Sequence, residues 1–228
     1  MISVSPALIC AFLAVSTGPL AAQDATEILN GARLAPTRQP AVLQARIRTE
    51  DSESPLIIRL KDEVITYETG NPPRVLQVSL HPGSTTLSEI TPGEKTLHPI
   101  TPERVHEELP GTGVTLQDLS LGFLYWPHPA LHGEESVGIR RCWKIDLQAP
   151  ANEPFYGVAR VWIDKEFGGI LKIEVYDKKG LLLRRFQLIS PQKIDGLWVP
   201  KQMRIEGFHP GNPSPISRTY LEVLSRRE

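Results

Sequence analysis

Residues 161–177 read VWIDKEFGGILKIEVYD, and this stretch decides the fold. Apolar residues alternate with charged or polar ones on both sides of a short glycine-containing turn. A period of two is typical of a strand with one buried and one solvated face, whereas a helix repeats every 3.6 residues. The stretch therefore predicts two antiparallel strands that form part of a one-sided sheet.

The same alternation extends in both directions from this hairpin. Towards the C-terminus it covers residues 181–190, 197–206 and 216–226, and towards the N-terminus it covers 143–147 and five short segments between residues 43 and 90. Glycine, proline, asparagine and aspartate separate the segments, as expected for turns. The sum is about eleven short antiparallel strands without any βαβ alternation, so the fold class is mainly β.

Two segments have helical spacing instead. Residues 24–34 place Ile28, Leu29 and Ala32 on one face. Residues 115–126 begin with Thr115, which is suited to cap a helix with Asp118 three positions later. Residues 127–136 are expected to form a loop, and residues 92–113 an irregular insertion within a single domain that spans residues 23–228.

The N-terminus has the pattern of a signal peptide. Residues 1–22 contain no charged side chain, and an apolar run precedes small residues suited to cleavage after Ala22. Cys10 lies inside the apolar run and follows Ile9, which does not fit a lipoprotein cleavage site. We therefore expect a periplasmic protein that is exported and not lipidated. Cys142 would be its one remaining cysteine, so an internal disulfide is excluded.

Composition and motifs argue against several functions. The net charge of −1 gives no field that would attract nucleic acid. We find no nucleophile elbow, no nucleotide-binding glycine loop and no zinc-protease motif. His128 and His132 are four residues apart, but neighbouring prolines deny them a shared helix. We expect no catalytic residues, no metal and no cofactor, and we interpret the chain as a non-enzymatic protein.

Four stretches resemble a known family when they are taken in order. They are residues 113–127, 141–147, 161–177 and 195–201, and they resemble the LolA-like outer-membrane lipoprotein-sorting proteins in their broad, mostly uncharacterised branch. The resemblance runs from about residue 113 to the end, while the first half matches by strand pattern only. It implies a half-open antiparallel β-barrel of about eleven strands, with helices covering its mouth.

The resemblance also implies a function. Members of the family hold acyl chains on an apolar concave face, so this chain would be a periplasmic carrier for lipid or acylated lipoprotein cargo. Its partners would be those acyl chains and a membrane-bound transporter or acceptor, and we expect a monomer. The alternative is a periplasmic sensor or regulatory module that uses the same half-barrel without transport.

The residues expected at such a site follow from the alternation and the helical spacing. Residues expected to line the cavity are Trp143, Ile145, Leu147, Val161, Ile163, Leu171, Ile173, Val175, Leu197 and Val199. Residues expected in the lid are Leu116, Leu119, Phe123 and Trp126. Apolar alternation alone leaves another interpretation open, in which these side chains simply form a filled core against the two helices.

Overall fold

The computed structural model describes residues 20–34, 39–71, 73–81 and 83–226. The predicted signal peptide lies outside the described residues up to position 19. Among the helices that are described, none combines the length and the apolar character needed to cross a bilayer.

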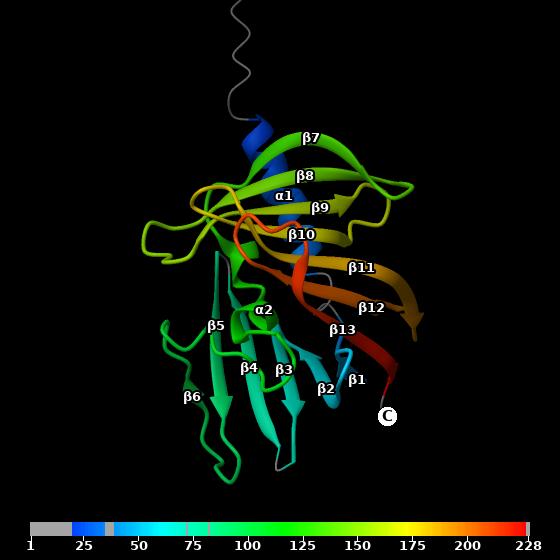
Figure 1. The fold of residues 1–228 in the computed structure, drawn as a ribbon. Helices are drawn as coiled ribbons and strands as arrows, with labels where there is room; N and C mark the ends of the chain where they lie inside the picture. Colours follow the sequence, from blue (N-terminus) through cyan, green and yellow to red (C-terminus); the bar gives the residue numbers. More distant parts are fainter. Residues whose placement is uncertain (1–19, 35–38, 72, 82, 227–228) are drawn as a thin grey trace, which may run out of the picture.

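In the described residues, thirteen strands form one antiparallel sheet in the order β6-β5-β4-β3-β2-β1-β13-β12-β11-β10-β9-β8-β7 (Figure 1). The N-terminal meander contains β1 (Ala41–Arg48), β2 (Glu53–Lys61), β3 (Val64–Thr69), β4 (Arg74–His81), β5 (Ser84–Ile90) and β6 (His98–Pro99). The C-terminal meander contains β7 (Ala130–Val137), β8 (Arg140–Gln148), β9 (Tyr156–Asp164), β10 (Ile170–Asp177), β11 (Leu182–Ile194), β12 (Leu197–Phe208) and β13 (Pro215–Arg226). The edge strands β6 and β7 do not pair with each other, so the sheet stays unclosed, and the predicted fold class is confirmed.

The eleven predicted strands are all present, and two more join them at the edges. The two-residue strand β6 lies within the predicted insertion 92–113, which is otherwise irregular. The prediction of a loop over 127–136 was wrong, because β7 pairs with β8 there. Most side chains of β7 are exposed, so the strand lacks the apolar alternation on which the sequence prediction relied.

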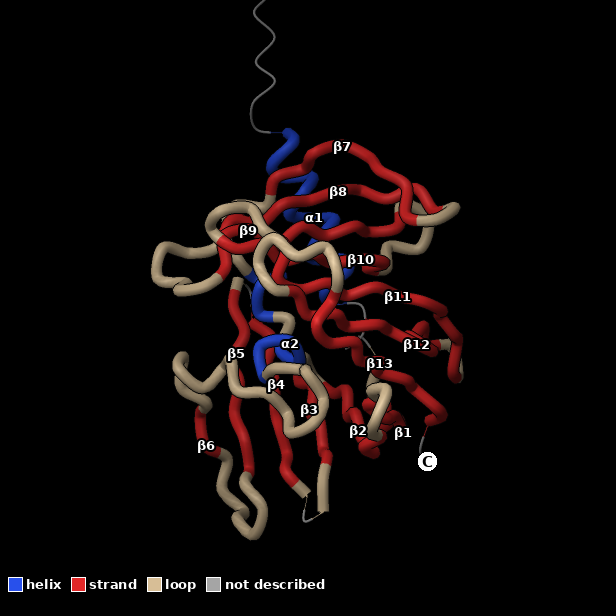
Figure 2. Tube along the Cα trace, viewed as in Figure 1, coloured by secondary structure: helices blue, strands red, loops and turns tan. Residues whose placement is uncertain are grey.

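The part of the chain that the structure describes has three helical segments, and they lie on the concave side of the sheet (Figure 2). Helix α1 (Leu20–Leu34) packs against β7 and β9 and buries Ala25, Leu29 and Ala32. Helix α2 (Leu116–Ser120) and the 3₁₀ helix η2 (Gly122–Tyr125) contact β5. The predicted capping box is confirmed, because Thr115 Oγ1 accepts from Asp118 N and Asp118 Oδ2 accepts from Thr115 N.

The predicted single helix over 115–126 is, however, broken in its middle. Leu121 adopts a left-handed conformation with φ of 47° and separates α2 from η2. Ser120 assists the break, because its Oγ accepts from the Gly122 amide at 3.1 Å. Such a local side-chain bond competes with helical hydrogen bonding, and hydrophobic spacing does not report it.

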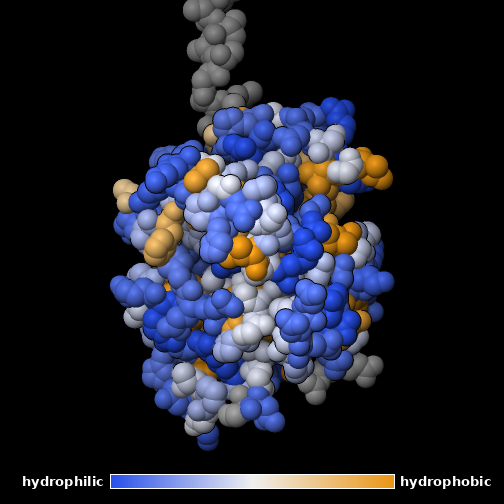
Figure 3. All heavy atoms as spheres, in the orientation of Figure 1, coloured by the Kyte–Doolittle hydropathy of each residue, from blue (hydrophilic) through white to orange (hydrophobic). Residues whose placement is uncertain are grey.

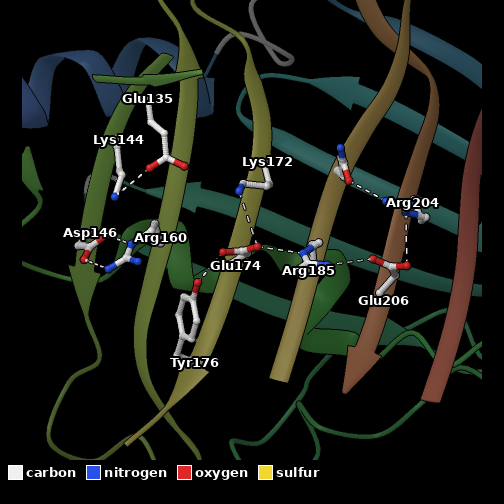
Figure 4. A network of polar contacts seen from close by, with 11 residues as sticks. Glu135, Lys144, Asp146, Arg160, Lys172, Glu174, Tyr176, Arg185, Arg204 and Glu206 are labelled. Atoms are coloured by element: carbon white, nitrogen blue, oxygen red, sulfur yellow. Dashed lines mark hydrogen bonds and ion pairs between the residues drawn. The ribbon is translucent and has the colours of Figure 1, made fainter. Parts of the chain in front are cut away.

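A row of alternating charges crosses the convex face of the C-terminal meander (Figure 4). Six successive strands place one member each at directly opposed positions: Asp146, Arg160, Glu174, Arg185, Glu206 and Arg218. Arg160 Nε lies 2.7 Å from Asp146 Oδ1, and Arg185 Nε lies 2.9 Å from Glu174 Oε1. Opposite charges at facing positions stabilise one register of a sheet over its neighbours.

The pairing of β1 with β13 joins the two meanders, and Glu222 lies at this seam. Its carboxylate accepts from Arg46 Nε at 2.6 Å and Arg48 Nη2 at 3.0 Å on β1, and from Gln202 Nε2 at 2.7 Å on β12. Burial disfavours ionisation of Glu222, but these hydrogen bonds outweigh it and lower its pKa to about 2.

We expect Glu222→Gln to lower the free energy of unfolding at pH 7 by about 1–2 kcal/mol, because the charge-assisted bonds across the seam are weakened. The native pKa is lower than the ordinary 4.5, so the stabilisation is fully present above pH 4.5 and is lost as the pH falls towards 2. Urea unfolding of both proteins between pH 7 and pH 2 measures this. The two curves should converge in acid, and a constant gap would contradict the assignment.

Candidate functional site

The concave face of the sheet carries most of the residues predicted to line a cavity. Eight of the ten belong to the main hydrophobic cluster and are buried: Ile145, Leu147, Val161, Ile163, Ile173, Val175, Leu197 and Val199. They come from β8, β9, β10 and β12, which places them on a continuous apolar wall.

Two of the predicted lining residues lie elsewhere. Leu171 packs with Cys142 and Trp162 in a separate small cluster, because the pairing of β9 with β10 is irregular between Ile170 and Lys172. An added residue in a strand shifts the alternation, so the prediction that Leu171 shares a face with Ile173 was wrong. Trp143 is only partly buried and lies outside the main cluster, with Lys165 Nζ 3.9 Å above its ring.

The lid segment, residues 115–126, covers this wall from the inside. The four predicted lid residues are buried in the same cluster: Leu116, Leu119, Phe123 and Trp126. The Phe123 ring lies 5.5 Å from that of Phe186 on β11. In this state the concave face is occupied by the chain's own helices, so wall and lid form a packed core together.

Polar side chains tie the lid segment and the loop before it to the rest of the molecule. Tyr67 on β3 donates its hydroxyl to the Leu119 carbonyl at 3.1 Å. Arg33 on α1 donates to the Leu124 carbonyl at 3.1 Å. The Thr219 hydroxyl on β13 donates to the Thr112 carbonyl. All three donors bind main-chain oxygens, so they fix the position of the segment whatever its side chains are.

A buried charged pair lies at the beginning of α2. Arg184 Nη2 lies 3.5 Å from Asp118 Oδ2, and Arg184 Nη1 donates to the Gly113 carbonyl at 3.2 Å. Burial raises the pKa of Asp118, and the Arg184 guanidinium opposes that rise. Burial, assisted by the Asp118 carboxylate, also raises the pKa of Tyr156 to about 12. The N-terminal end of the lid segment is therefore held by charged groups that are partly removed from water.

Two polar oxygens of α2 are incompletely satisfied. Gln117 Oε1 and Asp118 Oδ1 are buried and have no hydrogen-bond partner. A buried acceptor without a partner costs about 1–3 kcal/mol relative to the same group in water. The packing of the lid is therefore opposed by its own polar groups, which would be hydrated if the segment moved outward.

An open groove of about 1250 Å³ borders the lid. The loop before α2 (Gly111, Thr112 and Gly113) forms one side, and the ends of β12 and β13 with the β1–β2 turn form the other. Exposed Phe155 and Ile216 are among its lining residues, together with Arg48, Arg184 and Arg218. The groove thus leads from solvent to the N-terminal end of the lid.

The sequence reasoning did not find the groove or the polar ties. Their residues come from strands, loops and a helix that are far apart in the sequence, and none belongs to a local motif. Arg33, Tyr67 and Thr219 look like ordinary members of amphipathic segments. Within the described part of the chain, no group of three histidine, cysteine, aspartate or glutamate side chains is placed to hold a metal ion.

Solved structures share this architecture. A domain of an outer membrane lipoprotein-sorting protein from Vibrio parahaemolyticus has a TM-score of 0.69 at 18% identity, covering 90% of this chain and 92% of that one. A DUF1329 family protein from Desulfovibrio piger has a TM-score of 0.67 at 18% identity, with coverage of 91% and 92%. A LolA superfamily protein from Nitrosomonas europaea has a TM-score of 0.62 at 17% identity, with coverage of 91% and 93%.

The chain therefore has the LolA-like fold that the sequence resemblance implied. No curated protein matches it significantly. A family model described only as an uncharacterized protein matches residues 90–225, which is more than half of the sequence. The chain belongs to this uncharacterized family.

We expect Thr115→Ala to loosen the lid before it affects the sheet, because the substitution removes one half of the capping box. The local opening free energy should fall by about 1 kcal/mol. Hydrogen exchange of amides in 115–126, compared with amides of β8 to β12, measures the effect. Equal changes in both sets would show that the segment does not open independently of the sheet.

Proposed function

We propose that this protein is a periplasmic carrier that binds the acyl chains of a lipid or lipoprotein on its concave face. The observation that carries the proposal is the unclosed apolar wall, which is covered by a lid segment tied down through polar contacts. The fold shared with lipoprotein-sorting proteins supports it, as does the predicted signal peptide.

The open sheet supplies the capacity that a closed small barrel lacks. A barrel of about eight strands is filled by its own side chains. Here thirteen strands without closure leave a concavity that α1, α2 and η2 fill. Displacing only the lid would expose wall residues such as Phe186, which contacts Phe123 of the lid, to an acyl chain.

The energetics favour a cargo chain that takes the place of the lid against the wall over one that inserts into an empty cavity. Each buried methylene contributes about 0.8 kcal/mol, so one long acyl chain matches the apolar contacts that the lid surrenders. The unsatisfied oxygens of Gln117 and Asp118 would be hydrated in the displaced lid, which lowers the cost of opening. Bound and closed states would then differ by only a few kcal/mol, as a reversible carrier requires.

The groove gives the proposed cargo a way in. It reaches the loop at Thr112 and Gly113, so a chain entering there would first meet the tied end of the lid. Release of the Thr219 and Arg184 contacts is then the first step of opening. We accordingly assign these contacts the role of holding the empty carrier shut.

A disulfide across this contact tests the proposal. Thr112→Cys with Thr219→Cys, in a Cys142→Ala background, joins positions whose side chain and carbonyl are already hydrogen-bonded. The oxidised protein should bind a fluorescent long-chain fatty acid at least about tenfold more weakly than the reduced form, because the lid is held against the wall. Thr219→Cys alone in the same background, treated with the same oxidant, should bind in both conditions.

Equal binding by the oxidised and reduced double variant would rule out acyl binding beneath this lid. Absence of binding by the unmodified protein to fatty acid and to fluorescent phospholipid would reject the carrier function itself. Transfer of the probe between two vesicle populations then separates a carrier from a sensor module, since a sensor would retain its ligand.

A further inference from the structure

Three large apolar side chains are exposed at one end of the C-terminal meander. Ile139 is 98% exposed at the turn between β7 and β8, and Phe167 is 44% exposed between β9 and β10. Trp198 is 57% exposed at the start of β12. We call these three residues the hairpin-tip patch. Figure 3 shows apolar surface on the right of the upper half, the side towards which these hairpins point in Figure 1.

The members of the patch are organised and not merely scattered. The Phe167 and Trp198 rings stack at 6.4 Å with an interplanar angle of 28°, although they belong to different hairpins. The Arg140 guanidinium lies 5.2 Å from the centre of the Phe167 ring, and Lys193 Nζ lies 5.9 Å from that of Trp198. Ile139 and Arg140 also border one surface hollow with Lys165 of the β9–β10 turn.

The packing of the sheet does not require an apolar residue at position 139. A side chain as exposed as Ile139 contributes almost no buried area to folding. The β10–β11 turn, at the opposite end of the same strands, presents Lys178 and Lys179 instead. The exposed apolar residues at that opposite end, Phe155 and Ile216, line the groove instead, so the hairpin-tip patch is a separate apolar surface.

The charges around the patch have a small positive surplus. Five cations stand against four carboxylates: Arg140, Arg141, Lys165, Lys193 and Arg226 against Glu134, Asp164, Glu166 and Asp195. Asp164 is buried beneath Arg140, whose Nε lies 2.6 Å from its Oδ2, so it faces away from solvent.

We propose that the hairpin-tip patch binds the surface of a phospholipid bilayer that contains anionic lipids. Tryptophan and phenylalanine beside arginine and lysine form the composition that partitions into the interfacial region of a bilayer. The aromatic rings enter the headgroup layer while the cations contact phosphates. The surface goes beyond the proposed function, because it would anchor the protein whether or not a cargo lies under the lid.

A bilayer suits the shape of the patch better than a protein partner does. The tips stand on separate hairpins, whereas protein interfaces place their strongest anchors in well-packed central pockets. A bilayer accepts protruding side chains at variable depth without a complementary surface. The modest charge surplus further predicts that apolar insertion, with electrostatics in support, supplies most of the affinity.

Vesicle flotation tests the proposal with the intact protein. Vesicles of phosphatidylcholine and phosphatidylglycerol at a ratio of about 7:3 should bind it, and pure phosphatidylcholine should bind it more weakly. Ile139→Ser should reduce the partition coefficient, and Ile139→Ser with Phe167→Ser and Trp198→Ser should reduce it at least about tenfold. Leu97→Ser, an exposed apolar residue of the other meander, should leave it unchanged.

Tryptophan quenching gives a second readout that folding defects do not imitate. Of the four tryptophans, only Trp198 is exposed. Brominated lipids should therefore quench the wild type, and Trp198→Phe should bind but lose most of this quenching. The Ile139 side chain makes almost no packing contacts, so Ile139→Ser should not affect folding. Weaker vesicle binding by this variant therefore cannot be attributed to misfolding.

Three outcomes would overturn the proposal. They are the absence of vesicle binding by the wild type, full binding by the triple variant, and a patch-dependent dimer in solution that does not bind vesicles. Each is distinct from failure of the acyl-probe experiment, which concerns the concave face and leaves this surface untouched.

Discussion

Pairs of opposite charges on the convex side of the C-terminal meander fix the register of its strands, and so determine which side chains point inward. Asp146, Arg160, Glu174, Arg185 and Glu206 pair in register, and a slip of one residue would turn them into the apolar interior. Such a slip would leave desolvated charges without partners, which costs far more than the pairs themselves contribute. The row therefore acts mainly through specificity, because it fixes which face of the meander is directed towards the apolar interior.

An apolar face on an unclosed sheet creates the second constraint. Without a partner strand between β6 and β7, the wall cannot close on itself and must be covered by something else. In the described structure α1, α2 and η2 provide that cover. The cover is unequal, because α1 is a long amphipathic helix, whereas α2 is short, interrupted at Leu121 and incompletely satisfied in its hydrogen bonding. This inequality supports the proposal that α2 and η2 are the part that moves.

The sequence predicted what depends on local periodicity. Alternation such as that from Val161 to Val175 located the strands, and the Thr115–Asp118 spacing located the cap. Periodicity did not locate β7, because the strand conformation there comes from pairing with β8. It also missed the change of face at Leu171, which comes from an irregularity in the pairing of β9 with β10. The groove and the ties from Tyr67 and Thr219 depend on which strands become neighbours, and a single sequence does not state that order.

The seam between β1 and β13 has a consequence for how the molecule assembles. Among the described strands, every other neighbouring pair in the sheet is also adjacent in sequence, whereas Arg46 and Glu222 are 176 residues apart. Each meander can form from hairpins with short loops, but joining them requires closure of a very long loop, which is entropically costly. Until then the edge of β1 remains unpaired and open to association with other chains. Because non-local pairing is slow, the topology prolongs the time for which this edge is exposed during folding.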